Sequence, residues 1–231
     1  GKYYESQFEE ATIELLHESH WQYAFGDDIH RKYTDPLIEE DLRNFLAVQY
    51  KDKNLTTSEM DSIVANLRNT GGQNDYYALR NAFLLYRDGY DFAYSDGRDN
   101  PFRLEYIDFE HPDHNIFRCV NQFVMEQGRE NRRPDILLFI NGIPVCIIEL
   151  KNPTNQNATI RDAHTQICTR YMRDIPSLLK YCALAVISDG AKNALGSTYT
   201  PFEFFYEWKK INNEGKAGKG LDTLRTLIRG A

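Results

Sequence analysis

The sequence lacks the features that mark several common protein classes. Its four cysteines include no C-x-x-C pair, which argues against a disulfide framework or a thiolate zinc site and predicts a reducing, cytoplasmic environment. It has no apolar run of 18 residues and no apolar N-terminal segment, so we expect neither a membrane-spanning helix nor a signal peptide. Acidic residues number 34 against 27 basic ones, and the net charge of −7 argues against a polybasic nucleic-acid-binding protein. A DNA enzyme stays compatible with this charge, because local patches and bound metal ions set the field at a site.

The chain is long and apolar enough to bury a core of its own. Its 231 residues are 42% hydrophobic and 13% aromatic, which is typical of one globular domain or at most two. Apolar residues at helical spacing predict helices over residues 6–17, 37–50, 56–67, 76–86, 159–172 and 221–228. Short apolar runs predict strands over residues 102–109, 116–125, 136–140, 145–148 and 182–187. An aromatic segment, residues 202–208, is expected to pack on the core.

The strongest chemical signal flanks a predicted hairpin. Asp135 precedes one strand, Glu149 ends its partner, and Asn141-Gly142 between them is a strong turn signal. Lys151 lies two residues after Glu149 and therefore projects from the same face of the strand. Carboxylates supply the oxygen ligands that Mg²⁺ prefers, and a metal-bound water is a better nucleophile toward a phosphodiester. Lys151 could hold that water or accept its proton.

The register of the hairpin decides whether the two carboxylates share a face. A strict two-residue turn would place Asp135 and Glu149 on opposite faces of the sheet. A three-residue loop, or a compensating bulge, would place them opposite each other on one face. Because Pro144 cannot donate a ladder hydrogen bond, a bulge or a longer loop is plausible here.

Other interpretations of these patterns are open at this stage. Most hairpins end in solvated charges, and this one could do so too. His111 and His114 could suggest a metal-binding pair, but Pro112-Asp113 between them indicates a turn. Residues 215–220 are rich in glycine and lysine, but they lack the complete phosphate-loop motif and read as a flexible loop.

The residues around the hairpin resemble a known family. Residues 132–144 and 148–153 resemble the nuclease motif of the restriction (R) subunit of type I restriction-modification enzymes, a PD-(D/E)xK nuclease. Phe8-Glu9-Glu10, residues 185–190 and residues 204–208 resemble further segments of that family. The resemblance implies an α/β, α+β-leaning fold: a PD-(D/E)xK restriction-endonuclease-like mixed sheet flanked by helices, with a helical insert.

The resemblance also implies how the chain is divided. It implies a single endonuclease domain over residues 1–231, with the helical insert at about 37–90 and the nuclease core at about 102–190. The C-terminal tail, at about 212–231, would lead toward an ATPase motor. The sequence holds no Walker A motif, so we expect the motor to lie outside these residues.

Four residues of the hairpin receive roles from the resemblance. Asp135 and Glu149 would bind Mg²⁺, and the main-chain carbonyl of Leu150 would assist them. Lys151 would handle the attacking water. All four lie within the segment that carries the most specific part of the resemblance.

Groups outside the hairpin would complete the site. The family's first helix lends a glutamate to the metal, and Glu9 matches that position best, with Glu5 second and Glu10 also a candidate. Arg132 and Arg133, just before the first strand of the hairpin, could contact DNA phosphates. The alternatives are a solvated helix face for the glutamates and a charged, solvated loop for the arginines.

The helix after the hairpin departs from the family pattern. Many relatives carry Gln-x-x-x-Tyr there, which is thought to orient the site and to contact DNA. Here Gln166 and Tyr171 are five residues apart, or roughly 140° around a regular α-helix, so they cannot share one face of it. We therefore expect that either Tyr171 acts alone or Gln166 acts with Arg170, or that this is a plain surface helix.

The function implied by the resemblance is Mg²⁺-dependent hydrolysis of phosphodiester bonds in double-stranded DNA. In the family, cutting is coupled to ATP-driven translocation and depends on modification (M) and specificity (S) subunits. Two other hypotheses stay open: a stand-alone PD-(D/E)xK nuclease of another family, and a catalytically silent module that docks DNA or protein. The DNA sequence recognised, the oligomeric state and the activity of the domain alone do not follow from the sequence.

Overall fold

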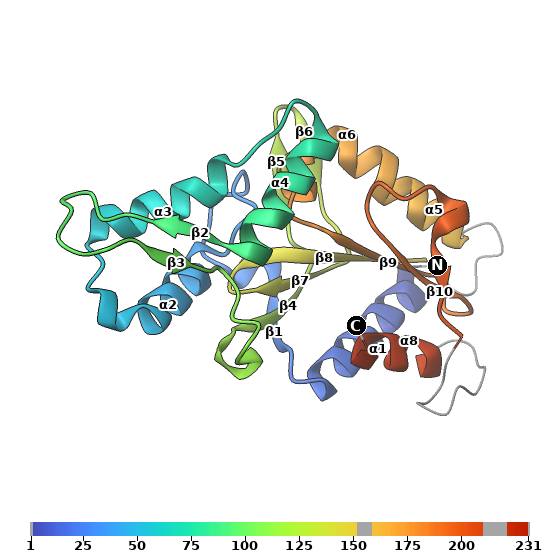
Figure 1. The fold of residues 1–231 in the computed structure, drawn as a ribbon. Helices are drawn as coiled ribbons and strands as arrows, with labels where there is room; N and C mark the ends of the chain where they lie inside the picture. Colours follow the sequence, from blue (N-terminus) through green and yellow to red (C-terminus); the bar gives the residue numbers. More distant parts are fainter. Residues whose placement is uncertain (1, 152–158, 210–220, 231) are drawn as a thin grey trace.

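A mixed seven-stranded sheet forms the centre of the computed structural model, which describes residues 2–151, 159–209 and 221–230 (Figure 1). The strands run in the order β1-β4-β7-β8-β9-β10-β11, with β1 parallel to β4, β8 parallel to β9, and the other neighbours antiparallel. Their bounds are β1 Gln22–Phe25, β4 Phe117–Asn121, β7 Ile136–Ile140, β8 Ile143–Leu150, β9 Leu184–Ser188, β10 Asn193–Gly196 and β11 Tyr206–Glu207. This α/β architecture confirms the predicted fold class and agrees with a PD-(D/E)xK-like fold.

Helices cover both faces of the sheet. On one face, α1 and α8 lie side by side (Figure 1). The other face carries a continuous helical segment of α5, a π-helix and α6, followed by α7. The bounds are α1 Lys2–Glu18, α8 Leu221–Gly230, α5 Ile160–Thr165, the π-helix Gln166–Tyr171, α6 Met172–Asp174 and α7 Pro176–Leu179. None of the described helices has both the length and the apolar character needed to cross a membrane.

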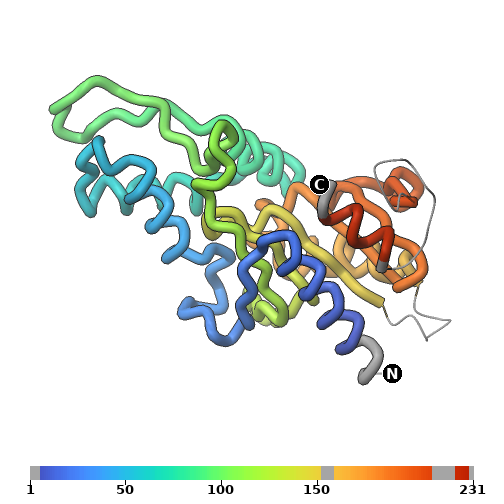
Figure 2. The backbone as a smooth tube through the Cα atoms, turned by 90° about the horizontal axis from the view of Figure 1, so that it is seen from below, coloured from blue at the N-terminus to red at the C-terminus, as the bar shows by residue number. Residues whose placement is uncertain are grey.

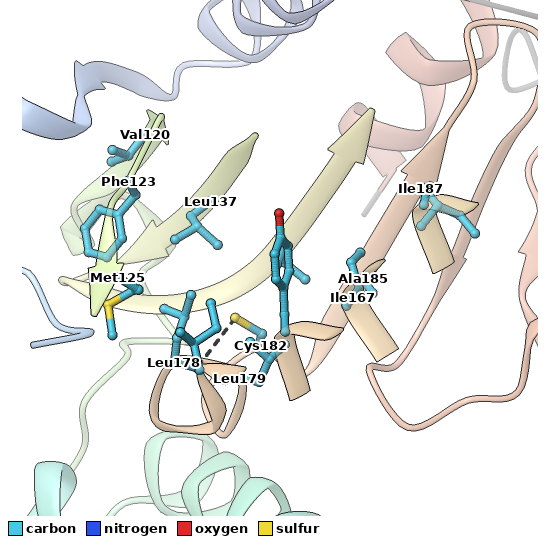
Figure 3. Close-up of a cluster of buried hydrophobic side chains, with 14 of the residues drawn as sticks. Val120, Phe123, Met125, Leu137, Ile167, Leu178, Leu179, Cys182, Ala185 and Ile187 are labelled. Atoms are coloured by element: carbon cyan, nitrogen blue, oxygen red, sulfur yellow. Dashed lines mark hydrogen bonds between the residues drawn. The ribbon is translucent and has the colours of Figure 1, made fainter. Parts of the chain in front are cut away.

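Alternation along the strands builds a core on each face. Successive side chains of a strand point to opposite faces, so Ile136 packs in the cluster under α1 while Leu137 packs in the cluster under α5–α7. Figure 3 shows the second of these clusters, where Val120 and Leu137 of the sheet gather with Ile167 of the π-helix. The inner strands β7, β8 and β9 are thus largely buried on both sides, and a site can form where these strands end.

The helical insert forms a separate cluster beyond one end of the sheet (Figure 2). It contains α2 Glu39–Gln49, α3 Thr57–Asn69, α4 Asp75–Asp88 and the two-stranded sheet β2 Tyr90–Phe92 and β3 Phe102–Leu104. A further small hairpin consists of β5 Met125–Gln127 and β6 Glu130–Arg132. Short 3-10 helices lie at Gly26–Asp28, Lys51–Lys53, Pro112–His114 and Phe202–Phe204.

The β7–β8 hairpin has the two-residue turn that its sequence signals. Asn141 and Gly142 have φ of 50° and 76°, and positive φ at both central residues is the type I′ arrangement. A side chain at Gly142 would collide with the main-chain carbonyl of Ile38. The turn is also fixed from the side, because the buried Asn141 amide oxygen accepts a hydrogen bond of 2.8 Å from the Ile116 N–H.

A bulge compensates for this short turn. Leu138 pairs with Cys146, whereas the next residue of β7, Phe139, pairs with Pro144, so Val145 is the extra residue of β8. Beyond the bulge, Ile136 pairs with Ile148, which places Asp135 opposite Glu149. Of the two alternatives that the sequence left open, the three-residue loop is absent and the compensating bulge is present.

The predicted helices are all present among the described residues. The capping box at residues 56–59 is confirmed, because the Thr56 hydroxyl accepts from the Glu59 N–H while the Glu59 carboxylate accepts from the Thr56 N–H. The helix predicted over residues 159–172 is interrupted by the π-helix. Of the aromatic segment 202–208, Phe205 is buried while Phe204 is 72% exposed.

Several strand predictions were wrong. Only Phe102–Leu104 of the long strand predicted over residues 102–109 is extended, and it pairs with β2 beside the insert instead of joining the main sheet. Residues 116–125 divide between β4 and the start of β5. The four-residue edge strand β1 was missed, because Gln22–Phe25 is too short and too exposed to show a clear apolar pattern.

Candidate active site

Two carboxyl groups meet at the open end of the β7–β8 hairpin. The Asp135 Oδ2 atom accepts a hydrogen bond of 2.8 Å from the main-chain N–H of Leu150. The neighbouring Asp135 carboxylate is close enough to raise the pKa of Glu149, and Glu149 is only 1% exposed.

Lys151 completes the predicted trio. Its Nζ atom lies 3.0 Å from Glu149 Oε1 and 2.7 Å from Gln166 Oε1, and its side chain is 13% exposed. Among the described residues, Lys151 is the only cation paired with Glu149. The ammonium group is thus fixed by two acceptors at the mouth of the site.

The π-helix brings Gln166 and Tyr171 together, contrary to the expectation for a regular helix. Gln166 Nε2 donates to Tyr171 Oη over 2.7 Å, and Tyr171 Oη lies 3.4 Å from Glu149 Oε2. Residues five apart are neighbours in a π-helix, and such turns are frequent at functional sites. The one-residue excess over the family spacing is therefore absorbed by the π-helix. Arg170 is exposed, and its partnership with Gln166 stays a prediction.

These contacts close a ring of four side chains. The Lys151 ammonium donates to Glu149 and to the Gln166 oxygen. The Gln166 amide donates to the Tyr171 hydroxyl, which in turn contacts Glu149. Every member is at least half-buried. The ring leaves each polar group little freedom to rotate, so the Glu149 carboxyl group and the Lys151 ammonium are held in a fixed relation.

Two neighbouring acids, Asp135 and Glu149, dominate the electrostatics of this site. Burial raises the pKa of Glu149 well above its ordinary range, and the neighbouring Asp135 raises it further. Lys151 opposes both effects without cancelling them.

Such a donor set fits a divalent cation, since carboxylate oxygens are the ligands that Mg²⁺ prefers and a cation would let both acids ionise. The role predicted for the carbonyl of Leu150 stays a prediction; the group of Leu150 that contacts Asp135 is its N–H.

Glu9 reaches the neighbourhood of the site from α1, through two amides. Asn121 Nδ2 donates to Glu9 Oε1 over 2.7 Å, and Gln122 Nε2 donates to both carboxylate oxygens over 3.0 Å. The alternative Glu10 is exposed and accepts only a long hydrogen bond of 3.5 Å from Ser6. The side chain of Glu5, the other alternative, lies outside the described residues.

The two predicted phosphate-binding arginines differ in environment. Arg132 forms ion pairs of 2.6 Å with Glu130 and 2.7 Å with Asp174, so much of its charge is used within the chain. Arg133 is exposed. Their contact with DNA stays a prediction.

A second group of possible metal ligands lies at the other end of the hairpin. Asp108, His111 and His114 each offer an atom within 4.8 Å of the others. The Asp108 carboxylate, however, accepts hydrogen bonds from the main-chain N–H groups of Glu110 and His111 and from Gln49. These hydrogen bonds give the Asp108 carboxylate a structural role in fixing a loop. The two carboxyl groups of Asp135 and Glu149 match the oxygen ligands that Mg²⁺ prefers better than this group with its two histidines does.

Sequence reasoning missed Asn121 and Gln122. Their signal was an adjacent pair of amides inside the apolar run predicted over residues 116–125. A polar pair in such a run indicates either a strand end or a buried contact, and here it marks both, because β4 ends at Asn121 and both amides bind Glu9.

The chain is similar in sequence to subunits of type I restriction enzymes. The chain is 29% identical to the type I restriction enzyme HindI endonuclease subunit of Haemophilus influenzae over 98% of its length. It is 29% identical over 89% of its length to a candidate type I restriction enzyme endonuclease subunit, MjaIXP, of Methanocaldococcus jannaschii. It spans 22% and 20% of the lengths of these two relatives. The family model of the type I restriction enzyme R protein N terminus matches residues 2–204, and the chain therefore belongs to this family.

Proposed function

We propose that this chain is the nuclease region of a type I restriction-modification R subunit and hydrolyses phosphodiester bonds of double-stranded DNA with Mg²⁺. The observation that carries the proposal is the meeting of Asp135, Glu149 and Lys151 at the open end of the hairpin. Family membership supports it, because the relatives are named as endonuclease subunits.

The residues of the site divide the chemistry among them. Asp135 and Glu149 would hold Mg²⁺, which neutralises charge on the phosphodiester and makes a bound water more nucleophilic. Lys151, fixed by Glu149 and Gln166, is placed to hold the attacking water and to handle its proton. Tyr171 and Gln166 orient Glu149 and Lys151 through the ring of hydrogen bonds.

The partners follow from the proposed system. The chain spans about a fifth of its first relatives, so we place ATP-driven translocation in a motor region outside it and DNA recognition with M and S subunits. Arg132 and Arg133 are proposed to contact DNA phosphates. Since the substrate is DNA, the cytoplasmic location predicted from the cysteine pattern is part of the proposal.

Cleavage by the complete enzyme tests the proposal. The full-length R subunit with its M and S partners should cut circular DNA in the presence of Mg²⁺ and ATP. Asp135→Asn and Glu149→Gln should each abolish cutting while ATP hydrolysis continues. Asp113→Asn and Glu203→Gln, the same chemical changes at exposed positions, should leave both activities unchanged.

The alternatives predict different outcomes. Unchanged cutting by Asp135→Asn would contradict the proposed site. A wild-type enzyme that binds DNA but never cuts it, with or without Asp135, would support the silent docking module. The hypothesis of a stand-alone nuclease from another family is at odds with the family found here.

A further inference from the structure

Within the described part of the chain, the Glu9 carboxylate accepts hydrogen bonds only from neutral side chains. Both of its oxygens accept hydrogen bonds from the amides of Asn121 and Gln122, at 2.7 to 3.0 Å. Other carboxylates of the chain are neutralised instead, as Asp41 is by Arg118 at 2.6 Å. Among the described residues, no ion pair includes Glu9. Amide donors fix the orientation of the carboxylate and leave its negative charge available to a cation.

The backbone at Gln122 is shaped for this contact. Gln122 has a φ of 55°, a left-handed conformation that is uncommon for residues other than glycine and that recurs at functional sites. Its main-chain N–H donates to the Asp135 carbonyl over 3.3 Å. One residue thus binds Asp135 with its backbone and Glu9 with its side chain, which couples the position of the helix-borne acid to the hairpin.

The neighbouring strand supports this conformation. A side chain at Gly26, directly after β1, would collide with the main-chain carbonyl of Gln122. Tyr23 of β1 donates its hydroxyl to Asn121 Oδ1 over 3.0 Å. Because the amide oxygen of Asn121 is occupied in this way, its NH₂ group must face Glu9.

We infer that Asn121 and Gln122 are positioning residues that fix the Glu9 carboxylate relative to the Asp135 end of the hairpin, with Tyr23 setting the orientation of Asn121. This inference rests on the proposed function and adds to it Glu9, the helix-borne acid that the family resemblance implies, together with a dedicated support for Glu9. The amides contact neither the phosphodiester nor the cation; their effect on catalysis passes through Glu9.

Metal affinity tests the inference directly. Calorimetric titration of this chain with Mn²⁺ compares the wild type with Gln122→Met, which keeps the length of the side chain but cannot donate, and with Gln122→Glu, which repels Glu9. Both variants should bind Mn²⁺ about tenfold more weakly, a loss of about 1.4 kcal/mol. Gln73→Met and Gln73→Glu, at an exposed position, are the matched controls and should bind as the wild type does.

A second readout separates positioning from damage to the fold. In the complete restriction enzyme, the Gln122→Met variant should cut slowly at low Mg²⁺ and recover toward the wild-type rate at high Mg²⁺. Gln122→Asn, which tolerates a left-handed backbone but is too short to reach Glu9, should behave in the same way with an unchanged unfolding midpoint.

Three outcomes are decisive. Weaker Mn²⁺ binding and rescue by Mg²⁺ support the inference. Unchanged Mn²⁺ affinity and an unchanged Mg²⁺ dependence in the Gln122 variants would overturn the inference. The proposed function would still be supported in that case if Asp135→Asn lost Mn²⁺ binding. No Mn²⁺ binding by the wild type, with or without duplex DNA, would contradict the proposed function and this inference together.

Discussion

The two ends of the β7–β8 hairpin each bury a carboxylate, and they hold it in opposite ways. At the turn end, Asp108 is 5% exposed and is surrounded by donors. Although burial favours its neutral form, hydrogen bonds from the His111 N–H, Gln49 and His114 lower the pKa of the Asp108 carboxyl group to about 2. At the open end, burial and Asp135 raise the pKa of Glu149 well above its ordinary range.

This difference separates an acid with a structural role from one for which we propose a functional role. Asp108 has its charge satisfied within the chain, and it organises a loop that Asn115 connects to the hairpin turn through Asn141. Glu149 faces another acid, and its ion pair with Lys151 does not cancel the resulting rise in its pKa. A divalent cation would let both acids ionise. The turn end secures the register that brings the two acids of the open end together.

Removing the ammonium group at the open end should have the largest effect on function. Lys151→Met keeps most of the apolar stem of the side chain but removes the group that we propose handles the water, so cleavage by the complete enzyme should fall about 1,000-fold. Lys192→Met, at an exposed position, should cut normally. A Lys151→Met enzyme that cuts within a few-fold of the wild type would remove Lys151 from the chemistry.

Removing the acid at the turn end should change stability instead. Asp108→Ala leaves the Glu110 and His111 N–H groups without their acceptor, which should cost about 3 kcal/mol in the free energy of unfolding by urea. Cleavage per folded molecule should be unchanged. Asp113→Ala, at an exposed site, is the control, and an equally unstable control would argue against a special role for Asp108.

The two acids should also give stability opposite dependences on pH in metal-free buffer. Glu149 has a raised pKa in the folded chain, so its contribution is present below its ordinary pKa of 4.5 and is lost as the pH rises through the folded value. Asp108 has a lowered pKa, so its contribution is present above 3.8 and is lost as the pH falls toward about 2.

Urea unfolding across this pH range should show each trend disappear in one variant. The loss at high pH should be absent from Glu149→Gln, and the loss at low pH should be absent from Asp108→Ala. Both trends persisting in both variants would show that other groups control the stability of the chain.

Replacing the π-helix by a regular α-helix should have the smallest effect on cleavage. Deleting the exposed Thr169 would restore four-residue spacing between Gln166 and Tyr171, which lie on one face of a regular α-helix at that spacing. Cleavage should stay within about threefold of the wild type, about 0.7 kcal/mol in the barrier. Gln166→Met, which breaks the ring of hydrogen bonds, is the comparison. A Thr169 deletion that slows cleavage as much as Gln166→Met would show that the π-helix itself is required.

The sequence predicted the local features well because their causes are local. Thr56 and Glu59 form a capping box wherever that spacing opens a helix, and Asn141-Gly142 makes its turn through its own backbone preferences. The hairpin carboxylates and Lys151 were found for the same reason, since alternation along two strands places them at one end.

The errors came from contacts between distant segments. Strand β1 exists because β4 pairs with it, not because its own four residues are apolar. The pairing of Gln166 with Tyr171 depends on a π-turn that closes over Glu149, and α-helical periodicity cannot show it. The support of Glu9 by Gln122 joins residues 113 positions apart.

Anomalous diffraction from crystals of this chain grown with Mn²⁺ and duplex DNA would locate the metal, and so test whether Asp135 and Glu149 hold it. We predict a Mn²⁺ peak between the carboxylates of Asp135 and Glu149 that disappears in Asp135→Asn. A peak at Asp108, His111 and His114 with none at the open end would contradict it.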